Sequence, residues 1–171
     1  MAAERTVVVG GEKLAAAFRR ARGSGPAILA GALYREAEAV MLAAKRLAPS
    51  DLGALRASGQ VQPPVITAGG IEVTMGFGDA ATGYAVYVHE GTGPAVGRPA
   101  FMPPVDVIRA WAVRHGMPAE AGFAVARAIG RRGLRPLKYL ERPLLEAARD
   151  MEARLAGAVL KELERVAGRP S

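Results

Sequence analysis

Residues 84–92 read Tyr-Ala-Val-Tyr-Val-His-Glu-Gly-Thr, and we predict that the fold is organised around them. Alternate positions carry β-branched or aromatic residues, which is the spacing of a strand covered on both faces. Glycines and a proline follow, and they would end the strand in a loop over residues 93–99 with neither strand nor helix character. Six residues define this fold-centre motif: Tyr84, Tyr87, His89, Glu90, Gly91 and Thr92.

The residues before the motif are predicted to complete an antiparallel sheet over residues 59–92. Apolar and polar residues alternate from Ile71 to Phe77, as in a half-buried strand. A second strand is expected over Gln60–Thr67, where Pro63-Pro64 would either split it or confine it to an edge. Ala68-Gly69-Gly70 would form the hairpin turn between the two strands.

Helical periodicity dominates the rest of the chain. An apolar stripe over residues 26–48 predicts a long helix that lies across the sheet. The sequence predicts a single α+β domain with a small antiparallel sheet of three to four strands, packed by a long N-terminal and a long C-terminal helix, with an inserted helical pair. The other predicted parts are an N-terminal strand and helix within residues 1–24 (Thr6–Val9 and Glu12–Arg22), the helical pair over 103–133 and a C-terminal helix over 140–167, with Pro143 in or near its first turn.

The composition excludes several classes of protein. The chain has no cysteine, so disulfide scaffolds, thiolate zinc sites and cysteine nucleophiles are ruled out. Half of the 171 residues are apolar, which is enough for a packed core. No run approaches the roughly 18 apolar residues of a membrane span, and the N-terminal residues lack the pattern of a signal peptide. We therefore expect a soluble, non-secreted protein with no membrane partner.

Charge is distributed unevenly along the chain. Residues 57–97 contain three acidic side chains and no lysine or arginine, whereas residues 98–142 contain nine basic and three acidic ones. This asymmetry indicates an acidic partner such as nucleic acid, or self-association of unlike faces; arginine-rich coding bias is the alternative explanation. The loop 93–102 and an arginine-rich arm are predicted as contact surfaces, and the arginines are Arg98, Arg109, Arg114, Arg127, Arg131, Arg132 and Arg135.

The residues that could support catalysis are not arranged for it. His89-Glu90 lacks a third orienting group and a placed nucleophile, and His115 is expected at a helix end, where the helix dipole favours a cation. No cluster of His, Asp and Glu has metal-ligand spacing. The loop over 91–97 lacks the Lys-Ser/Thr of a phosphate-binding loop. We therefore expect no enzymatic activity, no metal and no cofactor.

Residues 103–133 leave a DNA-binding alternative open, because two helices joined by a short turn could form a helix-turn-helix reader. The first two turns of the second helix are mostly apolar, with Phe123, Ala126 and Ile129 expected to face inward. A recognition helix needs polar side chains there to reach base edges. Non-specific contact with DNA phosphates remains as a hypothesis for the arginines at its C-terminal end, beside a solvated basic face.

Three groups of residues, in this order and spacing, resemble the small tail-component proteins of long-tailed bacteriophages, variously called neck, head–tail joining, minor tail or tail-completion proteins. They are Ala44-Lys45 with Ala48-Pro49 and Asp51–Ser58, then Tyr84-Ala85 with Val88–Pro94, then Pro136 with Tyr139–Leu144. The resemblance covers roughly residues 35–150. The helical pair also resembles an insertion in many members, and Leu137-Lys138-Tyr139 departs from the more proline- and phenylalanine-rich approach common there.

The resemblance implies a structural virion protein of a phage or prophage, located in the virion and in the host cytoplasm during assembly. It implies a subunit of an oligomeric ring at the head–tail junction, for instance a hexamer, with other phage neck and tail proteins as partners and no catalysis. A strand edge without a neighbour and unlike charges would suit head-to-tail contacts that close a ring. A basic ring lumen facing DNA is a further hypothesis.

Overall fold

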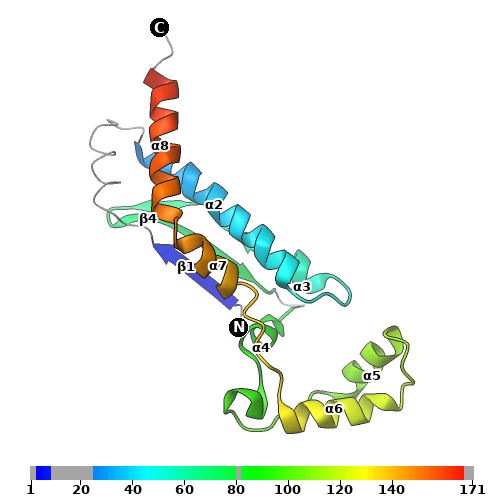
Figure 1. Ribbon diagram of the computed structural model, residues 1–171. Coiled ribbons are helices and arrows are strands. Elements are labelled where there is room, and N and C mark those ends of the chain that lie inside the picture. Colours follow the sequence, from blue (N-terminus) through cyan, green and yellow to red (C-terminus); the bar gives the residue numbers. More distant parts are fainter. Residues whose placement is uncertain (1–2, 9–24, 80–81, 168–171) are drawn as a thin grey trace.

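The computed structural model describes residues 3–8, 25–79 and 82–167. Within these ranges the chain is α+β, as predicted: a small antiparallel sheet is covered by long helices, and a helical pair projects away from it (Figure 1). The helix expected over Glu12–Arg22 lies outside the described residues. None of the described helices combines the length and the apolar character needed to cross a bilayer.

The central strand is β4 (Gly70–Phe77), which has neighbours on both sides. β1 (Ala3–Val8) runs antiparallel to one side of it, with Val8 opposite Glu72. On the other side β2 (Gln60–Val61) and β3 (Val65–Thr67) lie end to end, divided at Pro63-Pro64 as the sequence predicts. Proline cannot donate a backbone hydrogen bond, so the ladder is interrupted there.

The predicted alternation in β4 is confirmed. Ile71, Val73, Met75 and Phe77 are buried on the face toward the helices, whereas Glu72 points to the other, exposed face. Each pair of residues in an antiparallel ladder shares a face, so this pattern fixes which side of the sheet the helices cover.

The expected strand over residues 84–92 is wrong, because Ala85–Glu90 forms the short helix α4. Both sides of β4 are already occupied by other strands, so the sheet offers this segment no central position. In the helix Ala85 and His89, one turn apart, are buried, while Tyr87 is 56% exposed. A six-residue helix is too short to be stable by itself, so tertiary packing rather than local propensity selects this conformation.

The long helix is α2 (Gly25–Leu47), and its apolar stripe packs on β4. Leu29, Leu33, Ala37, Val40 and Ala44 are buried along it, whereas Leu47, which also lies within the predicted stripe over residues 26–48, is 51% exposed. A single turn, α3 (Ala54–Ala57), follows and buries Leu55. The core between α2 and the sheet is therefore built mainly from aliphatic side chains and alanine.

The predicted C-terminal helix is divided into α7 (Glu141–Ala148) and α8 (Met151–Ala167). Pro143 lies in the first turn of α7, as expected. Both helices pack against α2, and α8 buries Met151, Leu155 and Val159 (Figure 1). The chain bends at residues 149–150, which lets each helix follow its own part of α2.

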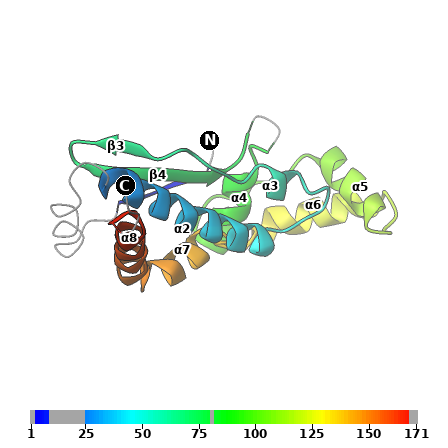
Figure 2. The ribbon, with the colours of Figure 1, turned by 90° about the horizontal axis from the view of Figure 1, so that it is seen from above.

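Residues 93–133, hereafter the arm, hold the predicted helical pair. A 3-10 turn, η1 (Gly93–Val96), leads to α5 (Val105–Arg114) and α6 (Ala121–Arg132). A Cβ on Gly122 would lie 2.8 Å from the Cα of Arg109, so this glycine allows the two helices to approach closely. Ala126 is buried as expected, but Phe123, expected to face inward, is 52% exposed. Figure 2 places the arm at the opposite end of the molecule from the turn between β3 and β4.

Candidate functional site

The chain enters and leaves the arm at one place, which we call the junction (residues 88–92 and 134–141). Thr92 N–H donates to Leu134 O at 2.9 Å, and Leu134 N–H donates to Thr92 O at 3.1 Å. Lys138 N–H donates to His89 O at 3.1 Å. The outgoing and returning segments are thus joined by backbone hydrogen bonds, although more than 40 residues separate them along the chain.

His89 lies at the centre of the junction and is 1% exposed. The backbone N–H of Glu141 donates to its Nε2 at 3.3 Å, so Nε2 acts as an acceptor. Nδ1 lies 3.0 Å from Glu90 Oε1 and therefore donates the hydrogen of the neutral ring to that carboxylate. Both nitrogens of this buried histidine are used within the protein, one toward each segment of the junction.

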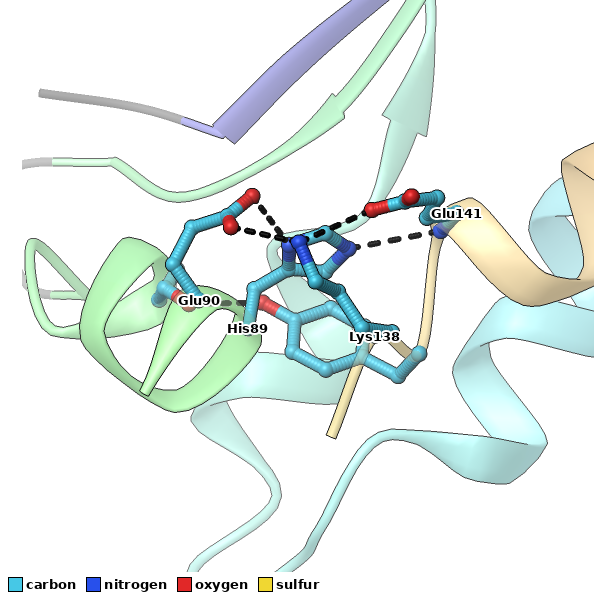
Figure 3. Close-up of polar contacts among 6 residues, drawn as sticks. His89, Glu90, Lys138 and Glu141 are labelled. Atoms are coloured by element: carbon cyan, nitrogen blue, oxygen red, sulfur yellow. Dashed lines mark hydrogen bonds and ion pairs between the residues drawn. The ribbon is translucent and has the colours of Figure 1, made fainter. Parts of the chain in front are cut away.

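Lys138 places its ammonium group between two carboxylates (Figure 3). Its Nζ lies 2.5 Å from Glu90 Oε2 and 2.9 Å from Glu141 Oε2. The backbone of Lys138 has φ 49°, a conformation that residues other than glycine seldom adopt. Hydrogen bonds at its own N–H and carbonyl hold the residue there, so the ammonium group is directed at the two carboxylates.

Tyr139 links the junction to the core. The ring is fully buried and packs edge-on against Phe77 of β4 and against His89, with ring centroids 5.0 Å and 4.9 Å apart. Its hydroxyl donates to Ala85 O at 2.9 Å. One side chain therefore contacts the sheet, α4 and the histidine together, which fixes α4 against the sheet.

The electrostatics of the junction favour the charged forms of the lysine and the glutamate. The hydrogen bond from Lys138 is the main reason that the pKa of Glu90 lies below its ordinary value of 4.5. The hydrogen bonds to Glu90 and then Glu141 raise the pKa of Lys138 above 10.5. Burial, followed by the nearby Tyr84, raises the pKa of Tyr139 to about 12. The ion pair between Glu90 and Lys138 is therefore maintained at neutral pH.

His89, Glu90 and Glu141 bring potential metal ligands within 4.8 Å of one another. The Lys138 ammonium, however, contacts both carboxylates, and both nitrogens of His89 are hydrogen-bonded. A cation would have to displace the lysine and break the bond from Glu141 N–H before it could gain these ligands. The geometry thus fits an internal ion-pair network that joins two chain segments better than a metal centre.

The seven predicted contact arginines fall into two groups. Arg109 and Arg114 on α5 form ion pairs, with Asp106 at 3.2 Å and with Asp51 at 2.5 Å. The second of these pairs ties α5 to the loop that follows α2. The other five make no ion pair with any residue described in the structure and are exposed; they are Arg98, Arg127, Arg131, Arg132 and Arg135.

An apolar groove opens beside the junction, between α4, the loop 93–104 and α6. Its volume is about 380 Å³, within the range of roughly 300–1,000 Å³ typical of ligand-binding pockets. The lining is almost wholly apolar or aromatic: Tyr84, Tyr87, Val88, Thr92, Gly93, Arg98, Pro99, Phe101, Pro103, Pro104, Val107, Ile129 and Leu134. Among the described residues that form this lining, Arg98 is the only charged one.

The sequence singles out His89 and Glu90, but it does not predict that Lys138, Tyr139 and Glu141, noted only in connection with the resemblance, complete the network. A signal was present, because Lys138 and Glu141 are spaced three residues apart in a segment that also carries the resemblance to tail proteins. The groove was missed as well. Its aromatic residues come from two segments, one of which the sequence predicts to be a strand and the other a loop.

Comparison of the chain with protein-family models, with curated proteins and with solved structures gave no match.

Proposed function

We propose that this protein is a structural subunit of a phage or prophage virion that acts in an oligomeric ring at the head–tail junction. The observation that supports this most is the convergence of the three segments that carry the sequence resemblance. Ser58 Oγ accepts a hydrogen bond from Gly78 N–H at 3.1 Å, next to Phe77. Phe77 packs on Tyr139, and Tyr139 packs on His89. Residues from Ser58 to Tyr139 thus form one continuous unit, although they are far apart in the sequence.

The arrangement of this unit is suited to a role in assembly. The junction residues hold the arm in place. His89, Lys138 and the two glutamates make hydrogen bonds and ion pairs with one another. The exposed surface of the arm is apolar in places and basic in others: Phe101 is 64% and Val107 62% exposed. Exposed apolar side chains grouped around a groove are typical of surfaces that bind another protein. The proposed partners are further copies of this chain and other phage neck and tail proteins, and the role requires no catalysis.

The proposal is tested by native mass measurement over a range of protein concentrations together with electron microscopy. We expect closed rings of uniform copy number, or rings that form once neighbouring neck or tail proteins are added. A chain that forms no ring under either condition would argue against the proposal. Turnover of a small substrate that is lost on His89→Ala would contradict it directly.

A second candidate function, non-specific DNA binding, is favoured by one feature of α6. Arg127, Arg131 and Arg132 lie on its exposed side around a shallow hollow of about 300 Å³ that also includes Phe123. Guanidinium groups without an ion-pair partner among the described residues are available for phosphates. Binding of duplex DNA measured over a salt series tests this function, and affinity that does not depend on salt would exclude it.

A further inference from the structure

Large apolar side chains along the groove beside the junction are exposed to solvent. Tyr87 is 56%, Phe101 64% and Val107 62% exposed along it. Two prolines in its wall, Pro103 and Pro104, keep the adjoining backbone free of helix until α5 begins at Val105. The apolar lining calls for an apolar occupant, and a volume of about 380 Å³ admits a few side chains, such as those of a strand or a tight turn.

The charge at the groove restricts the choice of occupant. Arg98 lines the groove and makes no ion pair with any residue that the structure describes, and no acidic residue belongs to the lining. The arm as a whole is basic, since residues 93–133 hold six basic and two acidic side chains. An occupant with apolar side chains and a neighbouring carboxylate would therefore be complementary to it.

The hairpin formed by β3 and β4 carries both exposed apolar side chains and a neighbouring carboxylate. Val65 and Ile66 of β3 are 58% and 54% exposed, although both lie in a strand. Glu72, directly opposite Val65 in the ladder, is exposed on the same face. Residues 57–97 contain no lysine or arginine, so no basic side chain of this segment would oppose Arg98.

The hairpin cannot reach the groove of its own chain. Both views show the turn between β3 and β4 at one end of the sheet and the arm beyond the other end (Figures 1 and 2). Two unlike, complementary surfaces at opposite ends of one chain produce a head-to-tail contact, and such contacts close into a ring when the rotation between copies allows it.

We propose that the β3–β4 hairpin of a second copy of this chain inserts into the groove edge-on, so that Val65 on one face of β3 and Ile66 on the other both contact the lining, with Glu72, on the face of Val65, near Arg98. This contact would be the interface between neighbouring subunits of the ring proposed above. It rests on that proposal only for the closure of the ring.

The absence of cysteine makes disulfide trapping a selective test, because each introduced thiol is the only one in its chain. An Ile66→Cys chain is mixed with a Phe101→Cys chain and oxidised mildly, and the covalent dimers are followed on a non-reducing gel. The matched control replaces Ile66→Cys with Leu160→Cys on α8, which is similarly exposed at 53%. We expect the first mixture to form mixed dimers at least tenfold faster than the control mixture. Equal rates would overturn the proposal.

Two further variants test the geometry. A chain carrying both Ile66→Cys and Phe101→Cys should give a ladder of covalent multimers, because a head-to-tail contact continues from copy to copy. Adding Arg98→Glu to the Phe101→Cys chain should slow trapping roughly twofold to fivefold, and adding Glu72→Arg to the Ile66→Cys chain should restore the rate. A rate that is not restored by the second charge change would remove the Glu72–Arg98 contact from the proposal. Circular dichroism of each variant checks that it is folded.

The outcomes separate this contact from the proposed function. Rings seen by electron microscopy without selective trapping would leave the ring proposal standing and refute the hairpin–groove contact. Selective trapping without rings, alone or with neck and tail proteins, would support the contact and refute the ring.

Discussion

Tyr139 donates its phenolic hydrogen to the backbone carbonyl of Ala85, 54 residues earlier in the chain, at 2.9 Å. This bond joins the segment that returns from the arm to the helix that precedes it, at a point where the tyrosine ring is fully buried. The contact helps to stabilise α4, because this helix is short and the Tyr139 ring packs on its buried side at His89. The stability of the junction should therefore depend on residues that are distant in sequence.

Replacement of Tyr139 by Phe should lower the free energy of unfolding by about 1 kcal/mol, since it removes one hydrogen bond while keeping the ring. Denaturant unfolding at neutral pH measures this. Tyr87→Phe is the matched control, because Tyr87 is 56% exposed, and it should leave the stability unchanged. Equal effects of the two substitutions would contradict a special role for the buried hydroxyl.

The same tyrosine predicts a loss of stability in alkali. Burial raises the pKa of Tyr139 from 10.0 to about 12 in the folded chain. The contribution of Tyr139 to the free energy of unfolding is therefore fully present below pH 10. It is lost as the pH rises to about 12, because only the unfolded chain releases the tyrosine proton in this window. The stability of wild type relative to Tyr139→Phe should fall by up to about 1.4 kcal/mol per pH unit there, so that Tyr139→Phe becomes the more stable protein within this window. A difference that stays constant with pH would refute this assignment.

Lys138→Met should destabilise the junction by about 1–2 kcal/mol, a modest value because the ion pairs are partly solvated. The substitution leaves the carboxylates of Glu90 and Glu141 close together without the ammonium group between them. Lys138→Met combined with Glu90→Gln should recover part of the loss, since one negative charge is removed. Thermal or denaturant unfolding of the three proteins is the measurement, and a double variant less stable than Lys138→Met would argue against repulsion.

The ion pairs also set a dependence on pH. The pKa of Glu90 lies below 4.5, so its contribution is present above pH 4.5 and is lost as the pH falls through the lower folded value. The pKa of Lys138 lies above 10.5, so its contribution is present below pH 10.5 and is lost as the pH rises through the higher folded value. Both dependences should be weaker in Lys138→Met, as unfolding curves recorded at acid, neutral and alkaline pH would show.

Gly133→Ala should disrupt the junction. Gly133 has φ 74°, and a Cβ there would lie 2.0 Å from Thr92 O, inside the backbone contact between the two segments. We expect a loss of at least about 3 kcal/mol, because backbone atoms have to move. Gly97 is the control: its φ is 69°, but nothing lies within 4 Å of a Cβ there, so Gly97→Ala should cost only about 1 kcal/mol. Similar losses for both would show that φ alone, and not the close contact, explains the effect.

If α6 binds DNA, replacement of its three arginines by Ser should reduce the slope of log affinity against log salt by up to about 2.7, since each phosphate contact contributes about 0.9. The arginines are Arg127, Arg131 and Arg132. A control with the same change of charge replaces Arg35, Arg46 and Arg149, which are exposed elsewhere. Equal slopes for the two triple variants would indicate an effect of net charge alone.

Local sequence patterns predicted the elements whose residues alternate or repeat clearly. β4 could be recognised from its period of two and α2 from its apolar stripe, because burial of one face dictates both patterns. The split between β2 and β3 followed from Pro63-Pro64, which cannot complete a ladder. The candidate site was only partly visible: His89 and Glu90 were singled out, whereas their partners on the returning segment were not.

Residues 84–92 show what a local sequence pattern cannot predict. Tyr and Val favour a strand by themselves, but the sequence alone does not say that β1 and β2 would occupy both sides of β4. The bend at residues 149–150 has the same origin, since an unbroken helical pattern does not reveal where the C-terminal segment changes direction along α2. In such cases the conformation depends on which segments pair with the sheet or pack against a helix. That outcome is set only when the whole chain folds.

The sequence by itself therefore determined the α+β class, the central alternating strand, the long covering helix and the inserted helical pair. The tertiary structure decided that residues 85–90 are helical, that Lys138 lies between Glu90 and Glu141, and that an apolar groove opens beside the arm. The physical reason is that periodicity records which face of an element is buried, whereas contacts between residues about 50 positions apart depend on how the elements pack.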